Sequence, residues 1–518
     1  MRNEYSIQGI PISHLAETFG TPSYFYDGNI LEDTFQTLRR ALPSAMDIFY
    51  SLKANPNISI YNLLRSMGAY AEVCSLTELM TVLQCATEPE NIIFLGPGKT
   101  IDEIEACIDH DIYAIVCESL QELELIDVIA SQKGKIARVA LRVNPSFTVK
   151  GSRLTMGGKP RQFGIDEQIL LDSGPLLTRY EHVHLIGTHT YMGTRILDEE
   201  EVYQNTLKIL SMAEKLAEAI GFDLEMVDVG GGLGVPYFEG EASPDIHVLG
   251  EKMTPLIEAF HNRHPKTRLI MELGRYLVGR SGVFVSKSLY VKESMGESFV
   301  VTDGGTNCHM AAVGIGSVMK RNFPIRLLND MEGAPVASYN VTGPLCTPND
   351  LVGKLVPLPD VQPGDLIGVF NSGAYGPTAS PVQFLSHGYP AEVLIHRGQS
   401  LLIRSRDRYQ DLLNKQHLHT FQKQKGNEGF EMNEIIEKIT RTLVDVLELD
   451  DSTVILPSTQ LFEELNLDST SIIDLIISLE DAFEGLNIEQ GDLEPKHFET
   501  VESLSAFVLT HSDVVVER

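Results

Sequence analysis

The 518-residue sequence has no tryptophan and only six cysteines, at positions 74, 85, 107, 117, 308 and 346. None of them forms a C-x-x-C pair, which argues against a structural zinc site, and we expect no metal site. No apolar run reaches 18 residues, and no basic segment followed by an apolar one opens the sequence. We therefore expect no membrane span or secretory signal, and a cytoplasmic protein with reduced thiols.

Basic residues are also scarce, because 41 lysines and arginines stand against 71 acidic residues, for a net charge of −30. Such a surface argues against nucleic acid as a partner, since binding phosphates needs clustered Lys and Arg. Residues 431–518 alone hold 21 acidic and 4 basic side chains. The polar segment 411–430 before them is typical of a linker, so a small acidic domain follows a large one.

Between about 45 and 275, short apolar runs alternate with segments of helical length. The runs lie at 47–52, 69–73, 91–95, 113–117, 137–143, 183–189, 225–229 and 269–273. Helices at 101–109, 119–131 and 201–220 fit between them. Eight alternations predict an α/β fold of the (β/α)8 barrel type, with an open doubly wound sheet as the alternative.

The pattern changes after residue 275. Strand-like stretches at 282–291, 297–302, 365–370 and 391–403 are joined by Gly and Pro turns, which predicts a mostly β domain. The first 27 residues, with SYFYD at 23–27, are expected to pair with it. We therefore expect a barrel over 28–275, a β domain from 1–27 and 276–410, a linker over 411–430, and a small all-α domain over 431–518.

Two glycine-rich segments imitate nucleotide-binding loops. The GPGKT at 96–100 lacks the first glycine of a P-loop, since position 93 is Ile93. The GGGLG at 230–234 would need a glycine at Val235 to match the dinucleotide motif. What remains is a glycine cluster after a buried strand, which forms either a tight turn or a loop that lets backbone N–H groups approach an anion.

Polar residues and glycines follow the ends of several predicted strands, where barrel enzymes place their catalytic residues. They are Lys53, Arg142, Asn144, His189, Tyr191, Gly230, Gly231, Gly232, Glu272, Gly274 and Arg275. A lysine that ends an apolar strand can simply be solvated. Because the other residues follow strand ends as well, an active site is the favoured interpretation.

Residues 50–56 (YSLKANP) resemble the pyridoxal-phosphate lysine motif of the alanine-racemase-like barrel decarboxylases, the relatives of diaminopimelate and ornithine decarboxylases. The resemblance covers about 20–405. Its further motifs, in this order, are EVCS at 72–75, RVNP at 142–145, QFG at 162–164, VGGG at 229–232, ELGRY at 272–276, GPLC at 343–346 and GAYG at 373–376.

The resemblance implies that Lys53 holds pyridoxal 5'-phosphate and that Gly231, Gly232, Gly274 and Tyr375 bind its phosphate. Glu272 would face the pyridine nitrogen and keep it protonated. Racemases of this fold have a similar site but carry an arginine at the position of Glu272. The glutamate therefore favours decarboxylation over racemisation.

Arg275 or Arg142 would steer a carboxylate or support the cofactor ring. By the same resemblance, Cys346 protonates the α-carbon after CO2 leaves, and it comes from the partner subunit of a homodimer with shared active sites. Outside the GPLC motif, a small buried hydrophobic side chain would be the simpler interpretation of Cys346.

Two departures from the family pattern concern the ring and the substrate. Tyr191 replaces the histidine that stacks on the cofactor, and an aromatic face can still stack. Thr347 replaces the acidic residue that binds a distal ammonium after the cysteine. Ornithine- or lysine-like substrates are therefore disfavoured, although Asp350 or Asp330 could compensate.

Residues 462–470 (FEELNLDST) precede an amphipathic segment, and FETV follows at 498–501. Over about 431–512 this resembles an acyl or peptidyl carrier domain of four helices, with Ser469 as the phosphopantetheine attachment site. A helix N-terminus favours the added phosphate. Alternatively, Asp468 and Ser469 only cap the helix. A carrier implies 4'-phosphopantetheine, a phosphopantetheinyl transferase and an amino-acid-loading enzyme as partners, and its acidic face suits basic partners.

Together these features predict a pyridoxal-phosphate decarboxylase that acts on an aminoacyl thioester of its own carrier, in specialised biosynthesis. A short linker would raise the effective concentration of such a substrate. Three alternatives stay open: decarboxylation of a free amino acid with later loading of the amine, racemisation, and a non-catalytic scaffold that displays a carrier.

Overall fold

The computed structural model describes residues 3–148, 154–155, 157–314, 321–419, 428–450, 453–483, 486, 488 and 494–511. The chain divides into two compact units, Met1–Gln416 and His417–Arg518, and this boundary falls inside the expected linker. Within that linker, α12 (Tyr409–Leu413) ends and α13 (Glu428–Val446) begins. Residues 420–427 lie outside the described part of the chain.

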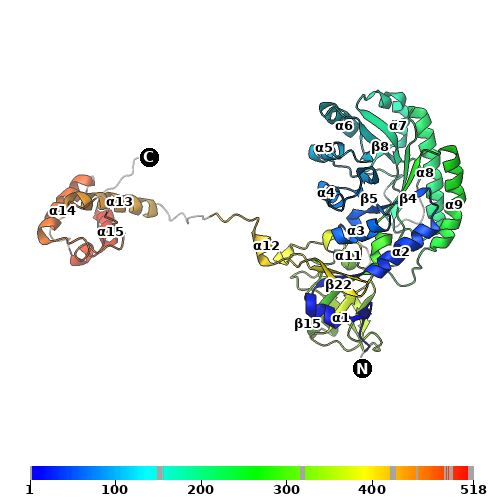
Figure 1. Ribbon diagram of the computed structural model, residues 1–518. Coiled ribbons are helices and arrows are strands. Elements are labelled where there is room, and N and C mark those ends of the chain that lie inside the picture. Colours follow the sequence, from blue (N-terminus) through cyan, green and yellow to red (C-terminus); the bar gives the residue numbers. More distant parts are fainter. Residues whose placement is uncertain are drawn as a thin grey trace. The chain divides into compact units, whose positions relative to one another are not determined.

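A closed barrel of eight parallel strands forms the centre of the first unit in the described residues (Figure 1). The last strand, β14, pairs with the first, β4, and this pairing closes the barrel. The fourth and fifth strands, β7 and β8, are also paired, so the ring of strands has no gap. An open doubly wound sheet would leave two edges, so the barrel prediction is confirmed. The strands are β4 (Met46–Ser51), β5 (Tyr70–Val73), β6 (Ile92–Phe94), β7 (Ala114–Cys117), β8 (Ala137–Asn144), β11 (Val183–His189), β13 (Met226–Gly231) and β14 (Arg268–Leu273).

These strands are apolar on both faces, as parallel strands covered by helices must be. Alternate positions form a small cluster of their own, which includes Phe49, Ile93, Ile186 and Ile270. The remaining positions pack against the helices that surround the strands (Figure 1). These helices are α2 (Gly28–Ala41), α3 (Ile58–Ser66), α4 (Leu76–Gln84), α5 (Ile101–Asp109), α6 (Leu120–Gln132), α7 (Glu167–Ser173), α8 (Glu199–Ile220) and α9 (Ile246–Arg263).

Local sequence sets several helix ends. Thr100 and Glu103 form a capping box at the start of α5, which satisfies two backbone N–H groups that have no partner inside the helix. The α8 helix begins after Asp198, whose side chain accepts the N–H of Glu200, and it ends at Gly221 in a left-handed conformation.

The β domain is a second sheet in the same unit. Its strands follow the order β19-β18-β16-β15-β3-β21-β22, with β20 also paired to β15 and β17 paired to β20. The SYFYD segment is β3 (Ser23–Asp27), which lies antiparallel to β15 and parallel to β21. The other strands are β15 (Gly282–Ser294), β16 (Glu297–Thr302), β17 (Ile325–Leu327), β18 (Ala337–Thr342), β19 (Leu351–Leu358), β20 (Leu366–Val369), β21 (Ala391–His396) and β22 (Gln399–Arg404).

The second unit is helical in its described residues, as expected. It contains α13, α14 (Ser469–Ala482), a 3-10 turn over Pro495–Phe498, and α15 (Val501–His511). Leu475 and Leu479 of α14, and Phe483 just after it, are buried in one apolar core with Ile439 of α13 and Leu504 of α15. Across both units, no helix in the described residues combines the length and the apolar character needed to cross a bilayer.

Candidate active site

Lys53 lies just past β4, in a single 3-10 turn, at the carboxyl end of the barrel. Its Nζ is 2.7 Å from Oε1 of Glu72, at the end of β5. The Lys53 side chain is 40% exposed, whereas Glu72 is fully buried. The Lys53 side chain is therefore partly exposed while its amine pairs with a buried carboxylate.

The charge on Lys53 is set by its neighbours. Burial opposes protonation, but Cys74, Glu72 and Glu272 outweigh it and raise the pKa of Lys53 well above the usual lysine value. Burial also raises the pKa of Cys74, whose thiol donates a hydrogen bond to Oε1 of Glu72 at 3.0 Å. A covalent bond through Nζ requires loss of its proton, and Glu72 is the adjacent acceptor.

Glu272 lies on β14, the neighbour of β4, and belongs to a buried group of three titratable side chains. Oε1 of Glu272 is 3.4 Å from Nε2 of His189, which ends β11. Asp228 of β13 completes the group, with one potential ligand atom from each residue within 4.8 Å of the others. All three are 3% exposed or less.

The pKa values of the two carboxylates are shifted in opposite directions. Burial, and then Glu272, raise the pKa of Asp228 well above its usual value. Burial alone would raise the pKa of Glu272 as well, but His189, Lys53 and a bond to Asp228 lower it to about 2. We therefore assign the proton to Asp228 and the negative charge to Glu272.

This arrangement fits a pyridinium ring. Oε1 of Glu272 is buried and accepts no hydrogen bond from the described residues, although Nε2 of His189 lies 3.4 Å away. Such an anionic acceptor needs a donor, and a protonated ring nitrogen supplies one. The fit of the pyridoxal group therefore rests on an observed buried acceptor as well as on the family motif.

The glycine cluster lies beside Glu272 and is too crowded for side chains. A Cβ at Gly231 would lie 1.6 Å from the carbonyl oxygen of Glu272. Gly232 has a φ of +100°, and a Cβ there would lie 2.2 Å from the carbonyl oxygen of Gly193. A glycine-only segment of this kind lets backbone N–H groups approach a phosphate closely.

Tyr375 and Arg275 border the same region. The Tyr375 N–H donates to the carbonyl of Ala54 at 2.7 Å, which brings a β-domain loop to the Lys53 turn. The Arg275 guanidinium lies 4.5 Å from the centre of the Tyr375 ring. Gly274, between Glu272 and Arg275, packs against Ala54, since a Cβ there would lie 2.7 Å from the Cβ of Ala54.

Tyr191 is the residue expected to stack on the ring. A Cβ at Gly230 would come within 3.0 Å of the Tyr191 ring, so the ring borders the glycine cluster. Burial raises the pKa of Tyr191, and Lys53 partly offsets this. The structure thus brings eight of the expected cofactor residues together: Lys53, Tyr191, Gly231, Gly232, Glu272, Gly274, Arg275 and Tyr375.

The two residues expected to bind substrate have other partners. Arg142 is 7% exposed and forms an ion pair of 2.6 Å with the buried Glu118, and its guanidinium lies 4.7 Å from the Phe163 ring. Asp350 is 2% exposed, and its carboxylate accepts the N–H groups of Thr306 and Leu345 at 2.6 and 2.8 Å.

Asp350 therefore supports the loop that leads to Cys346. Cys346 itself is exposed, and within the described residues no contact joins it to Lys53. Its role, and those of Arg142 and Asp350 toward a substrate, stay predictions. The side chain of Ser469, at the start of α14, lies outside the described residues.

Asp228 was not singled out by the sequence, Glu72 appeared only inside a motif, and His189 was named only as a residue at a strand end, without a role. A signal for Glu72 and Asp228 was present, because each puts a carboxylate inside an otherwise apolar strand. Such a residue needs a partner when it is buried. The sequence pattern does not show which residue is the partner of each buried carboxylate.

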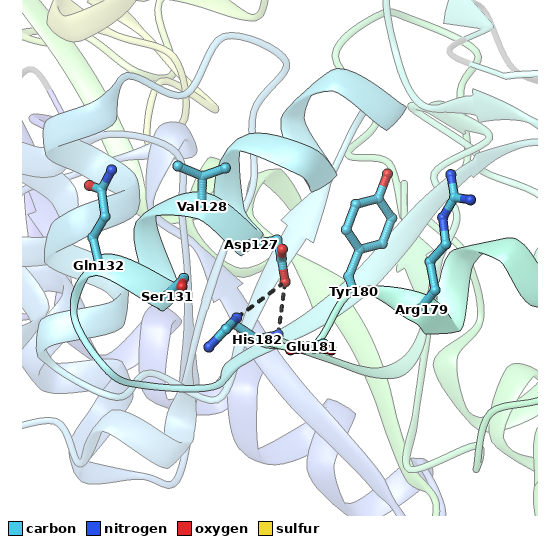
Figure 2. Close-up of a pocket in the computed structure, with 8 residues that line it drawn as sticks. All are labelled: Asp127, Val128, Ser131, Gln132, Arg179, Tyr180, Glu181 and His182. Carbon is cyan, nitrogen blue, oxygen red and sulfur yellow. Dashed lines mark hydrogen bonds and ion pairs between the residues drawn. The ribbon is translucent and has the colours of Figure 1, made fainter.

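A hollow at the opposite end of the barrel has a different character. It lies where α6 ends and β11 begins, and Arg179, Tyr180 and His182 are among its lining residues (Figure 2). Asp127 Oδ1 accepts the backbone N–H of His182 at 2.8 Å. The amino-terminal face of a barrel contributes stability rather than chemistry, so we place no site there.

Comparison with known proteins agrees with this geometry. Residues 29–279 match the family described as pyridoxal-dependent decarboxylase, pyridoxal binding domain. An L-glutamyl-[BtrI acyl-carrier protein] decarboxylase of Niallia circulans is 38% identical over 406 residues, which cover 78% of this chain and 95% of that protein. A diaminopimelate decarboxylase of Aquifex aeolicus is 31% identical over 407 residues, covering 78% and 94%.

Solved structures show the same fold. Diaminopimelate decarboxylase of Helicobacter pylori, complexed with L-lysine, has a TM-score of 0.70 at 29% identity and covers 78% of this chain and 98% of that one. The enzyme from M. jannaschii, also with L-lysine, has a TM-score of 0.74 at 28% identity, covering 80% and 96%. The lysine, the buried acceptor and the glycine cluster lie where these similarities extend. The chain therefore belongs to the family of pyridoxal-phosphate-dependent amino-acid decarboxylases that includes diaminopimelate decarboxylase.

Proposed function

We propose that this enzyme removes CO2 from an aminoacyl group held as a thioester on 4'-phosphopantetheine, attached to Ser469 of its own second unit. The observation that carries the proposal is the presence of both parts in one chain. A decarboxylase unit is followed by a separate acidic helical unit, whose α14 begins at Ser469 directly after Leu467 and Asp468.

The relative from Niallia circulans supports this choice of substrate class. By its name, that protein acts on a glutamyl group borne by an acyl-carrier protein, and it matches nearly its whole length to this chain. A glutamyl thioester is therefore the first aminoacyl group to test. Loading would require a phosphopantetheinyl transferase and an amino-acid-loading enzyme.

The surroundings of Asp350 support a substrate without a distal ammonium. Both of its carboxylate oxygens accept backbone N–H groups, and Thr347 carries no charge. An amino acid tethered through its distal carboxyl has no second ammonium to bind. The tethered form therefore removes the need for the acidic residue that is missing at position 347.

The residues have distinct parts in this reaction. When bound, pyridoxal phosphate supplies an electron sink for the electron pair that CO2 leaves behind. Lys53 would hold the cofactor, Glu272 would keep a proton on its ring nitrogen, and Tyr191 would pack against the ring. Cys346 would deliver a proton to the α-carbon.

We assign that cysteine to the partner subunit of a homodimer, since Cys346 is exposed in its own subunit. Mixing Lys53→Ala and Cys346→Ala proteins tests this assignment. Mixed dimers should regain about a quarter to a half of the wild-type activity, because one of their sites has both residues. Two inactive variants that remain inactive after mixing would show that each site uses its own cysteine.

The decisive experiment compares CO2 release by the wild type and Ser469→Ala with free amino acids and with the loaded chain. The tethered reaction predicts release only from the loaded wild type. Equal turnover of one free amino acid by both proteins would refute it. That result would favour the second candidate, decarboxylation of a free amino acid, which the similarity to diaminopimelate decarboxylases supports.

A further inference from the structure

A cavity of the first unit lies between α2 and the segments that follow β13 and β14. Its volume is about 270 Å3. The α10 helix (Arg275–Val278) and a 3-10 turn over Gly279–Ser281 follow β14, and both pack against α2. Pockets of about 300–1,000 Å3 hold drug-sized molecules, so this cavity suits a smaller ligand.

Two side chains of opposite charge line this cavity. Asp33 of α2 and Arg280 of the 3-10 turn are both exposed. Among the described residues, neither forms a hydrogen bond or an ion pair. Arg280 lies near Tyr276, since burial raises the pKa of Tyr276 to about 12 against the opposing charge of the guanidinium. A carboxylate and a guanidinium are therefore both available to a ligand that carries two charges.

The hollow at the opposite end of the barrel is a useful contrast, because an aspartate, an arginine and a tyrosine line it as well (Figure 2). Its aspartate already has partners. Asp127 accepts the backbone N–H of His182 at 2.8 Å, and its Oδ1 lies 3.9 Å from Nδ1 of the same residue. The availability of both charges thus distinguishes the cavity at Arg280 from this hollow.

The rest of the cavity lining is partly polar and partly apolar. Three side chains supply hydroxyl groups, namely Thr34, Thr37 and Ser243. Four supply apolar walls, namely Ile30, Val235, Pro236 and Pro244. Apolar walls favour a ligand with an apolar part, because that part leaves water on binding.

One loop of the β domain connects the cavity with the lysine site. The Asn371 side chain donates to the carbonyl of Pro236 at 3.1 Å, and the Gly373 N–H donates to the carbonyl of Gly279 at 3.0 Å. Both walls of the cavity are therefore bonded to this loop. The loop continues to Tyr375, whose backbone reaches the turn that carries the reactive lysine.

We propose that this cavity binds a free α-amino acid with an apolar side chain, and that the bound amino acid tightens the binding of pyridoxal phosphate. Arg280 binds the α-carboxylate, for which its planar fork is suited, and Asp33 accepts from the α-ammonium. A ligand that orders both walls also orders the loop they share with the lysine site. Cofactor and amino acid then strengthen each other's binding by the same factor.

The first test uses full-length protein whose cofactor has been fixed to Lys53 by reduction with borohydride, so that no amino acid can displace the lysine. Calorimetry compares L-leucine with 3-methylbutylamine, which lacks only the carboxylate, and with 4-methylpentanoate, which lacks only the ammonium. We expect L-leucine to bind about 10- to 100-fold more tightly than either, the usual effect of hydrogen bonds between charged groups.

Variants then locate the site. Arg280→Gln and Asp33→Asn should each weaken the binding of L-leucine about tenfold, because each loses one charged partner. Arg179→Gln is the matched control, because this exposed arginine lines the hollow at the opposite end of the barrel (Figure 2). Unchanged thermal unfolding midpoints show that the variants keep the fold.

The second test measures the link to the cofactor. Pyridoxine 5'-phosphate, which has no aldehyde and cannot react with amines, is titrated into cofactor-free protein with and without L-leucine. We expect L-leucine to tighten its binding about fivefold, and we expect Arg280→Gln to remove this effect.

Three results would overturn the proposal. L-leucine may fail to bind more tightly than the amine or the acid that lacks one charge, which would show that no zwitterion is recognised. Its affinity may survive both Arg280→Gln and Asp33→Asn, which would place the site elsewhere. An affinity for pyridoxine 5'-phosphate that ignores L-leucine would refute the link to the lysine site.

Discussion

The proton assigned to Asp228 can be tested by two substitutions at that position. Asp228 is fully buried, its Oδ1 accepts the Gly230 N–H at 2.8 Å, and its proton stabilises the charge on Glu272. In Asp228→Asn, the amide oxygen can still accept from Gly230 and the amide N–H can replace the carboxyl proton. Asp228→Ala removes both functions.

The two variants should therefore differ strongly. A hydrogen bond to a charged group is worth about 1.5–3 kcal/mol, so losing it in Asp228→Ala should weaken cofactor binding and lower kcat by about 10- to 100-fold. Asp228→Asn should stay within about threefold of the wild type, because its donor and acceptor are kept.

Absorbance titration with pyridoxal phosphate measures the cofactor affinity, and CO2 release measures kcat. Thermal unfolding without the cofactor controls for damage to the fold. A loss in Asp228→Asn as large as that in Asp228→Ala would refute the assignment, because it would mean that position 228 needs a negative charge rather than a proton.

Three further outcomes follow from the same structure. Lys53→Ala should abolish the absorbance of covalently bound cofactor while leaving the thermal unfolding midpoint of the cofactor-free protein within a few degrees, and a retained absorbance would contradict the role of Lys53. Burial raises the pKa of Glu78 to about 7, so between pH 4.5 and 7 the folded protein holds a proton that the unfolded chain releases, and stability falls as pH rises. Urea unfolding should show Glu78→Gln gaining stability over the wild type between pH 5 and pH 8, and a difference independent of pH would refute this. Glu118→Ala leaves Arg142 buried without its partner and should cost about 3–5 kcal/mol of unfolding free energy in urea, whereas a cost below 1 kcal/mol would show that water replaces the pair.

The barrel could be predicted from the sequence because its strands are buried on both faces. Each of the eight apolar runs, such as 47–52 and 269–273, overlaps an observed strand. Parallel strands place their carboxyl ends on one face, so the order of the runs was enough to bring Lys53 and Glu272 to the same end. The closure that makes them neighbours, between β14 and β4, needed the three-dimensional structure.

The remaining features depend on contacts between residues far apart in the chain. A sequence shows Asp350 near Cys346, but not that Thr306 and Leu345 donate to its carboxylate. In the same way, Arg195 and Arg321 are distant in sequence, yet both guanidiniums lie over the Phe238 ring. Such contacts have no periodicity, so no local pattern reveals them.

The position of β3 has a consequence for the order in which the protein is made. Its five residues leave the ribosome before the barrel, yet both of their strand neighbours, β15 and β21, come after it. This strand must wait through almost 370 residues of synthesis, until His396 has appeared, before its pairing is complete. A nascent barrel therefore carries an unpaired apolar strand at its amino end, and binding by a chaperone at residues 23–27 would protect that strand until the β domain closes over it.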